Sequence, residues 1–207
     1  MTLEAWSVFV AAAVLLCLSP GANNLMALTN GLRYGVVASL VAVGGRLAAF
    51  AVMIAIAAVG LGAVLAASEL AFQVVKWAGV AYLVYLGIRA LRAPAATALG
   101  PAVAVKAQSL AAMARKEFLV AIGNPKAILI FTAVFPQFLV AAEPALPQFA
   151  VMGATFLVTE IFAALAYVIS GRCFAPLLRE RASWINRISG GLLLTAAGLL
   201  ASASRRA

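Results

Sequence analysis

Six long apolar segments constrain the fold of this chain more than any other feature. They lie near residues 5–28, 37–63, 70–90, 116–140, 148–171 and 187–203. Each is long enough for a membrane-spanning helix, which needs about 20 mostly apolar residues. Hydrophobic residues make up 66% of the 207 residues and charged residues only 10%, too much apolar surface for a soluble fold of this size to bury. We therefore predict an all-α polytopic membrane protein with six transmembrane helices in a single membrane domain, residues 1–207.

The basic residues fall almost entirely in alternate connections, and this pattern predicts an orientation. The first, third and fifth connections and their flanks carry ten of them: Arg33, Arg89, Arg92, Lys106, Arg115, Lys116, Arg172, Arg179, Arg181 and Arg187. The second and fourth connections carry none. Cytoplasmic loops are enriched in Lys and Arg. We therefore expect the loop 91–115 in the cytoplasm and both termini on the outer side of the membrane. Lys116 and Glu117 are expected at the membrane interface.

This distribution also argues against a nucleic-acid partner. The net charge is +9, but the basic residues lie between apolar segments and form no stripe on a polar domain. No Lys or Arg precedes the first apolar segment, so we expect it to remain as a helix rather than to be removed as a signal peptide.

Three segments precede the long loop and three follow it, so the two halves enter the membrane from opposite sides. That topology predicts two inverted three-helix repeats, an arrangement common in secondary transporters.

Two apolar segments are interrupted by proline next to asparagine. The first contains Ser19-Pro20-Gly21-Ala22-Asn23-Asn24, and the fourth contains Gly123-Asn124-Pro125-Lys126, followed by Phe135-Pro136-Gln137-Phe138. Proline removes a backbone donor, and irregular backbone within a membrane is tolerated only where it is buried in protein or lines a cavity. Simple proline kinks are one explanation. Paired interruptions in the two halves instead favour a transport site.

Three charged residues fall deep inside the predicted spans: Arg46, Lys126 and Glu160. Each would be costly facing lipid, so each is expected to face a partner or a wet cavity. Lys76 lies near a helix end and can snorkel. Arg46 and Glu160 could form an ion pair that fixes helix packing. Alternatively, Arg46, Lys126 and the amides freed at the breaks could bind the carboxylate of a zwitterionic substrate, while Glu160 and the asparagine side chains bind its ammonium. Glu160 is the one carboxylate that the sequence places deep in the membrane, so it is the expected proton carrier if transport is proton-coupled.

These arguments define a set of expected substrate-binding residues. They are Ser19, Pro20, Gly21, Asn23, Asn24, Arg46, Asn124, Pro125, Lys126 and Glu160.

Missing residue types argue against an enzyme. The chain has no histidine, all its acidic residues are glutamates, and it has no phosphate-binding G-x-x-x-x-G-K-[ST] loop. Histidine-dependent nucleophilic mechanisms, zinc sites of the H-E-x-x-H type, aspartyl dyads and ATP hydrolysis at such a loop are therefore excluded. Cys17 and Cys173 are interpreted as small core residues rather than as a disulfide or a metal site. We expect no cofactor and no bound metal.

Several motifs resemble those of one known family. They are the segment Leu18–Asn24, Lys76-Trp77-Ala78-Gly79-Val80-Ala81-Tyr82-Leu83 with Leu86-Gly87, Asn124-Pro125-Lys126 and Phe135-Pro136-Gln137-Phe138. In order and spacing this set resembles the LysE/RhtB superfamily of bacterial amino-acid exporters, and especially its homoserine/threonine efflux branch. The resemblance implies a proton-driven plasma-membrane exporter of amino acids or their derivatives without a prosthetic group. It also places the family's acidic position of the fifth helix at Glu160.

The leading hypothesis is a secondary transporter that exports a small neutral amino acid such as homoserine or threonine in exchange for protons. The nearest alternative is an exporter of basic amino acids such as lysine and arginine. A passive channel or a structural membrane subunit would be a different class, but a channel would need a continuous polar stripe on several helices. A homo-oligomer is compatible with the sequence, because lipid-facing and subunit-facing apolar surfaces are alike in composition.

Overall fold

Every regular element in the described part of the chain is a helix, as the sequence predicts. The computed structural model describes residues 3–67, 69–92, 108–140 and 143–180, and positions 187–188, 190–191, 194–195, 197–198 and 201. In chain order the elements are α1 (Leu3–Leu18), α2 (Ala22–Tyr34), α3 (Val36–Ala67), α4 (Glu69–Arg92), α5 (Leu110–Ile122), α6 (Pro125–Leu129), the π-helix η2 (Ile130–Val134), the 3₁₀-helix η3 (Phe135–Phe138) and α7 (Ala145–Glu180).

Within the described residues, two helices are long and apolar enough to cross a membrane, α3 over Val36–Gly60 and α7 over Ala145–Gly171. The number rises to four if each of two bent helix pairs counts as one span. Only 39% of the most apolar stretch of α3 and of α7 is buried inside the protein. Most of their apolar surface therefore faces outward, as expected for helices in contact with lipid. The chain is thus a polytopic membrane protein, while the count of six spans stays a prediction.

The helix ends follow local sequence signals. α2 ends before Gly35, whose φ of 80° lies in the left-handed region that favours glycine, and α3 begins at the next residue. α5 begins at Leu110, inside the predicted loop 91–115, because the Ser109 side chain accepts a hydrogen bond from the Ala112 N–H and caps the helix. Positions 93–107 of that loop, and much of the predicted sixth span, lie outside the described residues.

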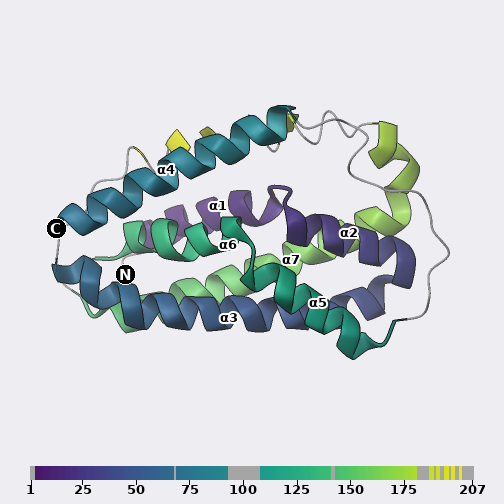
Figure 1. Cartoon of the computed structure of the whole chain (residues 1–207), viewed down its shortest axis with the longest axis horizontal. Helices are drawn as coiled ribbons and strands as arrows, with labels where there is room; N and C mark the ends of the chain where they lie inside the picture. Colours follow the sequence, from purple (N-terminus) through teal and green to yellow (C-terminus); the bar gives the residue numbers. More distant parts are fainter. Residues whose placement is uncertain are drawn as a thin grey trace.

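The two bent pairs run in opposite directions. In Figure 1 the chain passes from α1 to α2 along the bundle and returns from α5 to α6, so α1 and α6 lie toward one end and α2 and α5 toward the other. α3 packs mainly against α5, α7 packs against α1 and α2, and α3 and α7 contact each other. α4 lies at one edge of the bundle, where Gly87 approaches Gly190 and Leu194 closely.

Glycines bring two pairs of helices into backbone contact. A Cβ atom added to Gly31 of α2 would lie 2.3 Å from the carbonyl oxygen of Val168 in α7, and one added to Gly171 of α7 would lie 2.2 Å from that of Leu28 in α2. Small residues permit such approach between membrane helices. α3 and α5 meet in the same way, because a Cβ on Gly45 would lie 2.0 Å from the carbonyl oxygen of Ala114. We call these two units the α2–α7 pair and the α3–α5 pair.

Gly44 and Gly45 offer a matched test of this packing. We expect Gly45→Ala to lower the free energy of unfolding by about 1–3 kcal/mol, because the new methyl group overlaps a backbone carbonyl. Gly44 has no atom within 4 Å of an added Cβ, so Gly44→Ala should leave stability unchanged or raise it slightly through helix propensity. Thermal unfolding of the purified protein in detergent measures both changes. Equal midpoints for the two variants would refute the close contact of α3 with α5.

Candidate functional site

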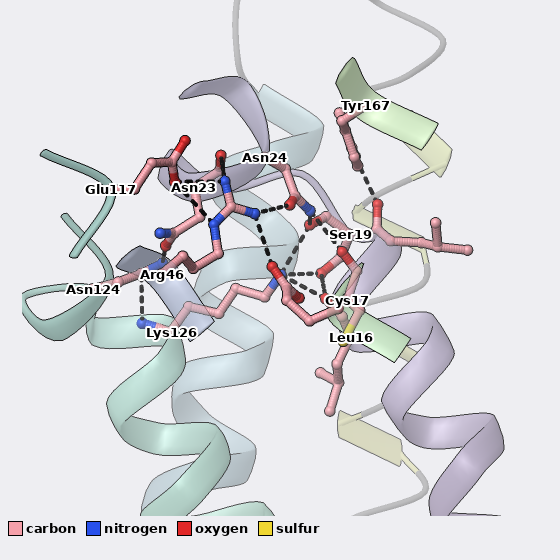
Figure 2. A network of polar contacts seen from close by, with 12 residues as sticks. Leu16, Cys17, Ser19, Asn23, Asn24, Arg46, Glu117, Asn124, Lys126 and Tyr167 are labelled. Carbon is pink, nitrogen blue, oxygen red and sulfur yellow. Dashed lines mark hydrogen bonds and ion pairs between the residues drawn. The ribbon is translucent and has the colours of Figure 1, made fainter. Parts of the chain in front are cut away.

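The two broken helices meet inside the bundle. α1 and α2 are bent by 58° across Pro20, and α5 and the segment from Pro125 to Phe138 are bent by 54°. At the second break Asn124 caps α6, because its side-chain oxygen accepts the Lys126 N–H at 3.0 Å and Pro125 occupies the first helical position. The Asn124 amide also donates to the side-chain oxygen of Asn23, which joins the two breaks directly. Figure 2 shows the resulting polar network.

The bend at Pro20 frees the last carbonyl groups of α1, and each accepts a hydrogen bond from a side chain. The bonds run from Lys126 Nζ to Leu16 O (2.7 Å) and Ser19 O (2.9 Å), from Asn24 Nδ2 to Cys17 O (2.6 Å), and from Tyr167 Oη to Leu18 O (2.7 Å). Lys126 also donates to the Ser19 hydroxyl oxygen. The ammonium group has three donors and meets three oxygens here, at the negative end of the α1 dipole. A lysine of one break therefore caps the helix of the other.

Arg46 is the largest fully buried side chain among the described residues, and all five of its N–H groups are hydrogen-bonded. The acceptors are Glu117 Oε2 (from Nε at 3.0 Å and Nη2 at 2.8 Å), Glu160 Oε1 (2.9 Å), Asn24 Oδ1 (3.3 Å) and the Asn23 carbonyl oxygen. The predicted ion pair between Arg46 and Glu160 is therefore present. In this conformation Arg46 has no further N–H to offer a substrate.

Glu117 is the main correction to the sequence analysis, which placed it at the membrane interface. Its carboxylate is fully buried and forms an ion pair with Arg46. Both carboxylate oxygens are used, because Oε1 accepts from the Asn30 amide at 3.1 Å and Oε2 accepts twice from Arg46. Its neighbour Lys116 is exposed, as expected. Among the side chains that the structure describes, Glu160 is therefore one of two buried carboxylates, and the formal charges of Arg46 and Lys126 balance them.

A small cavity lies where the breaks meet. It is lined by Leu16, Cys17, Gly21, Asn23, Asn24, Phe50, Asn124, Lys126, Ala127, Ile130, Phe156 and Glu160. Its volume is about 20 Å³, which is room for a single water molecule. Ligand pockets for small molecules are typically about 300–1,000 Å³. The Nδ2 atom of Asn23 is buried and has no hydrogen-bond partner among the described residues. In this conformation the polar site is therefore closed. The Asn23 amide is a hydrogen-bond donor that has no acceptor among the described residues.

The structure gathers most of the predicted site residues. Six of them line the cavity: Gly21, Asn23, Asn24, Asn124, Lys126 and Glu160. Beside the cavity, the Ser19 hydroxyl accepts a hydrogen bond from Lys126, and Arg46 donates a hydrogen bond to Glu160. Pro20 and Pro125 lie at the bends and act on the backbone. Cys17 belongs to the buried core as predicted, whereas the side chain of Cys173 lies outside the described residues.

Sequence reasoning missed Glu117, Asn30 and Tyr167, although a periodic signal was present for two of them. Asn23 and Asn30 of α2, and Glu160 and Tyr167 of α7, each lie seven residues apart. Positions seven apart lie on one helix face after two turns. Asn30 and Tyr167 therefore extend the polar faces of Asn23 and Glu160, whereas Glu117 lies on α5, which ends before Asn124.

Replacing Glu117 by glutamine should destabilise the protein. An amide has only one acceptor oxygen, so Glu117→Gln must turn its NH₂ group toward the donors of either Asn30 or Arg46. We expect a loss of about 1–3 kcal/mol in unfolding free energy from the donor left unpaired. The exposed Lys116→Gln is the matched control and should change stability by less than about 0.5 kcal/mol. Thermal unfolding in detergent compares them, and an unchanged midpoint for Glu117→Gln would contradict the buried ion pair.

Comparison with known proteins agrees with this architecture. The family model of LysE type translocators matches residues 14–204. The homoserine/homoserine lactone efflux protein of Salmonella typhimurium is 32% identical over 98% of both chains, and a membrane protein of Vibrio cholerae named only as uncharacterized is 34% identical over 98% of this chain and 99% of its own. The leucine efflux protein of Salmonella choleraesuis is 29% identical over 69% of this chain and 66% of its own. No solved structure matches. The chain therefore belongs to the LysE family of translocators, which are transporters and not enzymes.

Proposed function

We propose that this protein exports small neutral amino acids or their derivatives, of the homoserine or threonine kind, across the bacterial plasma membrane in exchange for protons. Relatives over the full chain and over two thirds of it are named for efflux of homoserine, homoserine lactone and leucine. These compounds share an amino group and an uncharged side chain. The proposal takes this shared chemistry, rather than any one compound, as the substrate class.

The proposed topology has six spans in two inverted repeats, with both termini outside. The opposite directions of the two bent pairs support it, because an inverted repeat requires its broken helices to be antiparallel (Figure 1). The charge pattern then places α2 and α5 toward the cytoplasm and α1 and α6 toward the outside. The cavity between the breaks lies where the four half-helices meet.

One observation carries the proposed function: two broken helices meet at a cavity that holds a carboxylate, an ammonium group and an unused amide N–H. We propose that the substrate carboxylate binds the Asn23 amide beside the positive charge of Lys126, whose three donors are already paired, while the substrate ammonium binds Glu160. Arg46 acts indirectly by holding Glu160, since its own donors are paired. The half-helix ends at Ser19, Pro20, Gly21 and Asn24 and at Asn124 and Pro125 set the positions of these groups.

The other residues that line the cavity favour a substrate with a neutral side chain over one with a basic side chain. Leu16, Phe50, Ala127, Ile130 and Phe156 present apolar surface to the cavity. Glu160 is the one carboxylate among the lining residues of this cavity, and Arg46 already bonds it. A lysine or arginine substrate would bring a second cation without a partner, which is costly in a buried site.

Proton coupling follows from competition at Glu160. A substrate ammonium and a proton both neutralise this carboxylate, so binding of one disfavours binding of the other. Export then alternates the two: substrate leaves on the outer side, Glu160 takes up a proton there, and the proton leaves toward the cytoplasm before the next substrate binds. A proton on Glu160 also weakens its bond to Arg46, while Arg46 keeps Glu117.

The test uses purified protein in proteoliposomes loaded with labelled homoserine, threonine, leucine or lysine. An imposed pH gradient, acidic outside, should accelerate efflux of the neutral amino acids and should not accelerate efflux of lysine. Efflux of lysine in preference to the others would favour the alternative of a basic amino-acid exporter. Equal efflux after the gradient is collapsed would favour a passive channel.

We expect Glu160→Gln to abolish efflux driven by a pH gradient while the protein still accumulates in the membrane. A glutamine oxygen can still accept the single hydrogen bond from Arg46, and Arg46 keeps the charge of Glu117. Exchange of labelled homoserine for unlabelled homoserine should survive better than net efflux, because exchange moves no proton. Normal gradient-driven efflux in Glu160→Gln would exclude Glu160 as the proton carrier.

A further inference from the structure

Gln137 is a buried amide without a partner. Its side chain is 7% exposed, and neither its Nε2 nor its Oε1 atom has a hydrogen-bond partner among the described residues. Among the described residues, Asn23 Nδ2 is the one other buried side-chain atom without a hydrogen-bond partner, and Asn23 lines the cavity of the proposed transport site. Buried polar groups are nearly always hydrogen-bonded, so an exception requires an explanation.

Gln148 shows that the same side chain can be satisfied in this protein. It is 3% exposed, and its amide makes four hydrogen bonds to backbone atoms. Its Oε1 accepts the Val140 N–H at 2.9 Å, and its Nε2 donates to three carbonyl oxygens. Gln148 is therefore a structural glutamine. The absence of any such bond at Gln137 in the described part of the chain indicates a different role.

Gln137 lies in the least regular backbone of the bundle. The segment changes from α-helix in α6 to π-helix in η2 and 3₁₀-helix in η3, and Pro136 precedes Gln137. π-Helical turns occur often at functional sites. About eleven residues separate Lys126 from Gln137, which corresponds to roughly 16 Å of helix. In the proposed topology the segment from Lys126 to Gln137 lies along the outer half of the transport pathway.

A cluster of aromatic rings connects the cavity to this segment. Phe50 and Phe156 line the cavity and pack edge-to-face on Phe131, with centroids 5.4 and 5.2 Å away. Phe131 in turn contacts Phe135 at 5.1 Å. Phe9 contacts both residues of η3 that bracket Gln137, Phe135 and Phe138. In the proposed topology this cluster extends from the cavity toward the outer side.

We infer that the Gln137 amide is a second binding site for the amino acid, used on the outer side of the aromatic cluster. This inference rests on the proposed function. One amide supplies both a donor for the substrate carboxylate and an acceptor for its ammonium group. Because the amide is neutral, its burial costs less than burial of a charged group would. A neutral partner also binds a zwitterion weakly enough to release it.

The test compares Gln137→Met with Gln148→Met, which remove the amide and roughly keep side-chain volume. If Gln137 serves the substrate, Gln137→Met should keep or raise the thermal midpoint in detergent, because it removes two unpaired buried groups. Its homoserine efflux from proteoliposomes should fall about tenfold or more, the value of one hydrogen bond to a charged group. Gln148→Met should lower the midpoint, because it strips partners from the backbone.

Two results would overturn this inference. Unchanged homoserine efflux in Gln137→Met would show that the amide has no part in transport. A lower midpoint or failure to accumulate would show that the amide is paired within the protein, as at Gln148. A wild-type protein that exports none of the tested amino acids would instead refute the proposed function, so the two failures are distinguishable.

Discussion

The guanidinium group of Arg46 joins four helices beside the site. It extends from α3 and bonds Asn23 and Asn24 of α2, Glu117 of α5 and Glu160 of α7. A buried cation needs compensating charge and acceptors for all its donors, and two carboxylates with two asparagines supply them. The position of each broken helix therefore depends on a single side chain. Removal of either carboxylate changes the charge balance, but only Glu117 uses both of its oxygens in holding the network together.

Each helix break is completed by the other. Pro20 and Pro125 free backbone groups that lipid cannot satisfy, and the bundle satisfies them with side chains. Lys126 from the second break binds the carbonyl end of α1, and the amide of Asn124 binds Asn23. Two interruptions that would each be costly alone become compatible with the membrane when they face one another. Their meeting also brings the charged groups of Lys126 and Glu160 to the same cavity.

The sequence predicted much of this arrangement because prolines and charges in an apolar segment are conspicuous. The breaks, the all-helical fold and the ion pair of Arg46 with Glu160 could be expected from residue type alone. Glu117 could not, because it follows Arg115 and Lys116 and resembles part of a basic interface. Only the register of α5, which begins at Leu110, turns the Glu117 side chain into the bundle, where Asn124 also lies. Gln137 was visible within a motif, but its lack of partners is a property of packing that no residue pattern specifies.

The glycine contacts divide the bundle into two parts. Gly31 and Gly171 hold α2 against α7, and Gly45 holds α3 against α5, so that neither pair can slide internally without backbone collision. Between the pairs the contact is of another kind, because a Cβ added to Gly153 of α7 would meet the side chain of Ile54 in α3 rather than backbone. The bond from Arg46 to Glu117 lies inside the α3–α5 pair, whereas the bond from Arg46 to Glu160 crosses to the α2–α7 pair. In the proposed transport cycle, loss of the Glu160 charge would therefore weaken a bond between the pairs and leave the backbone contacts within each pair as they are.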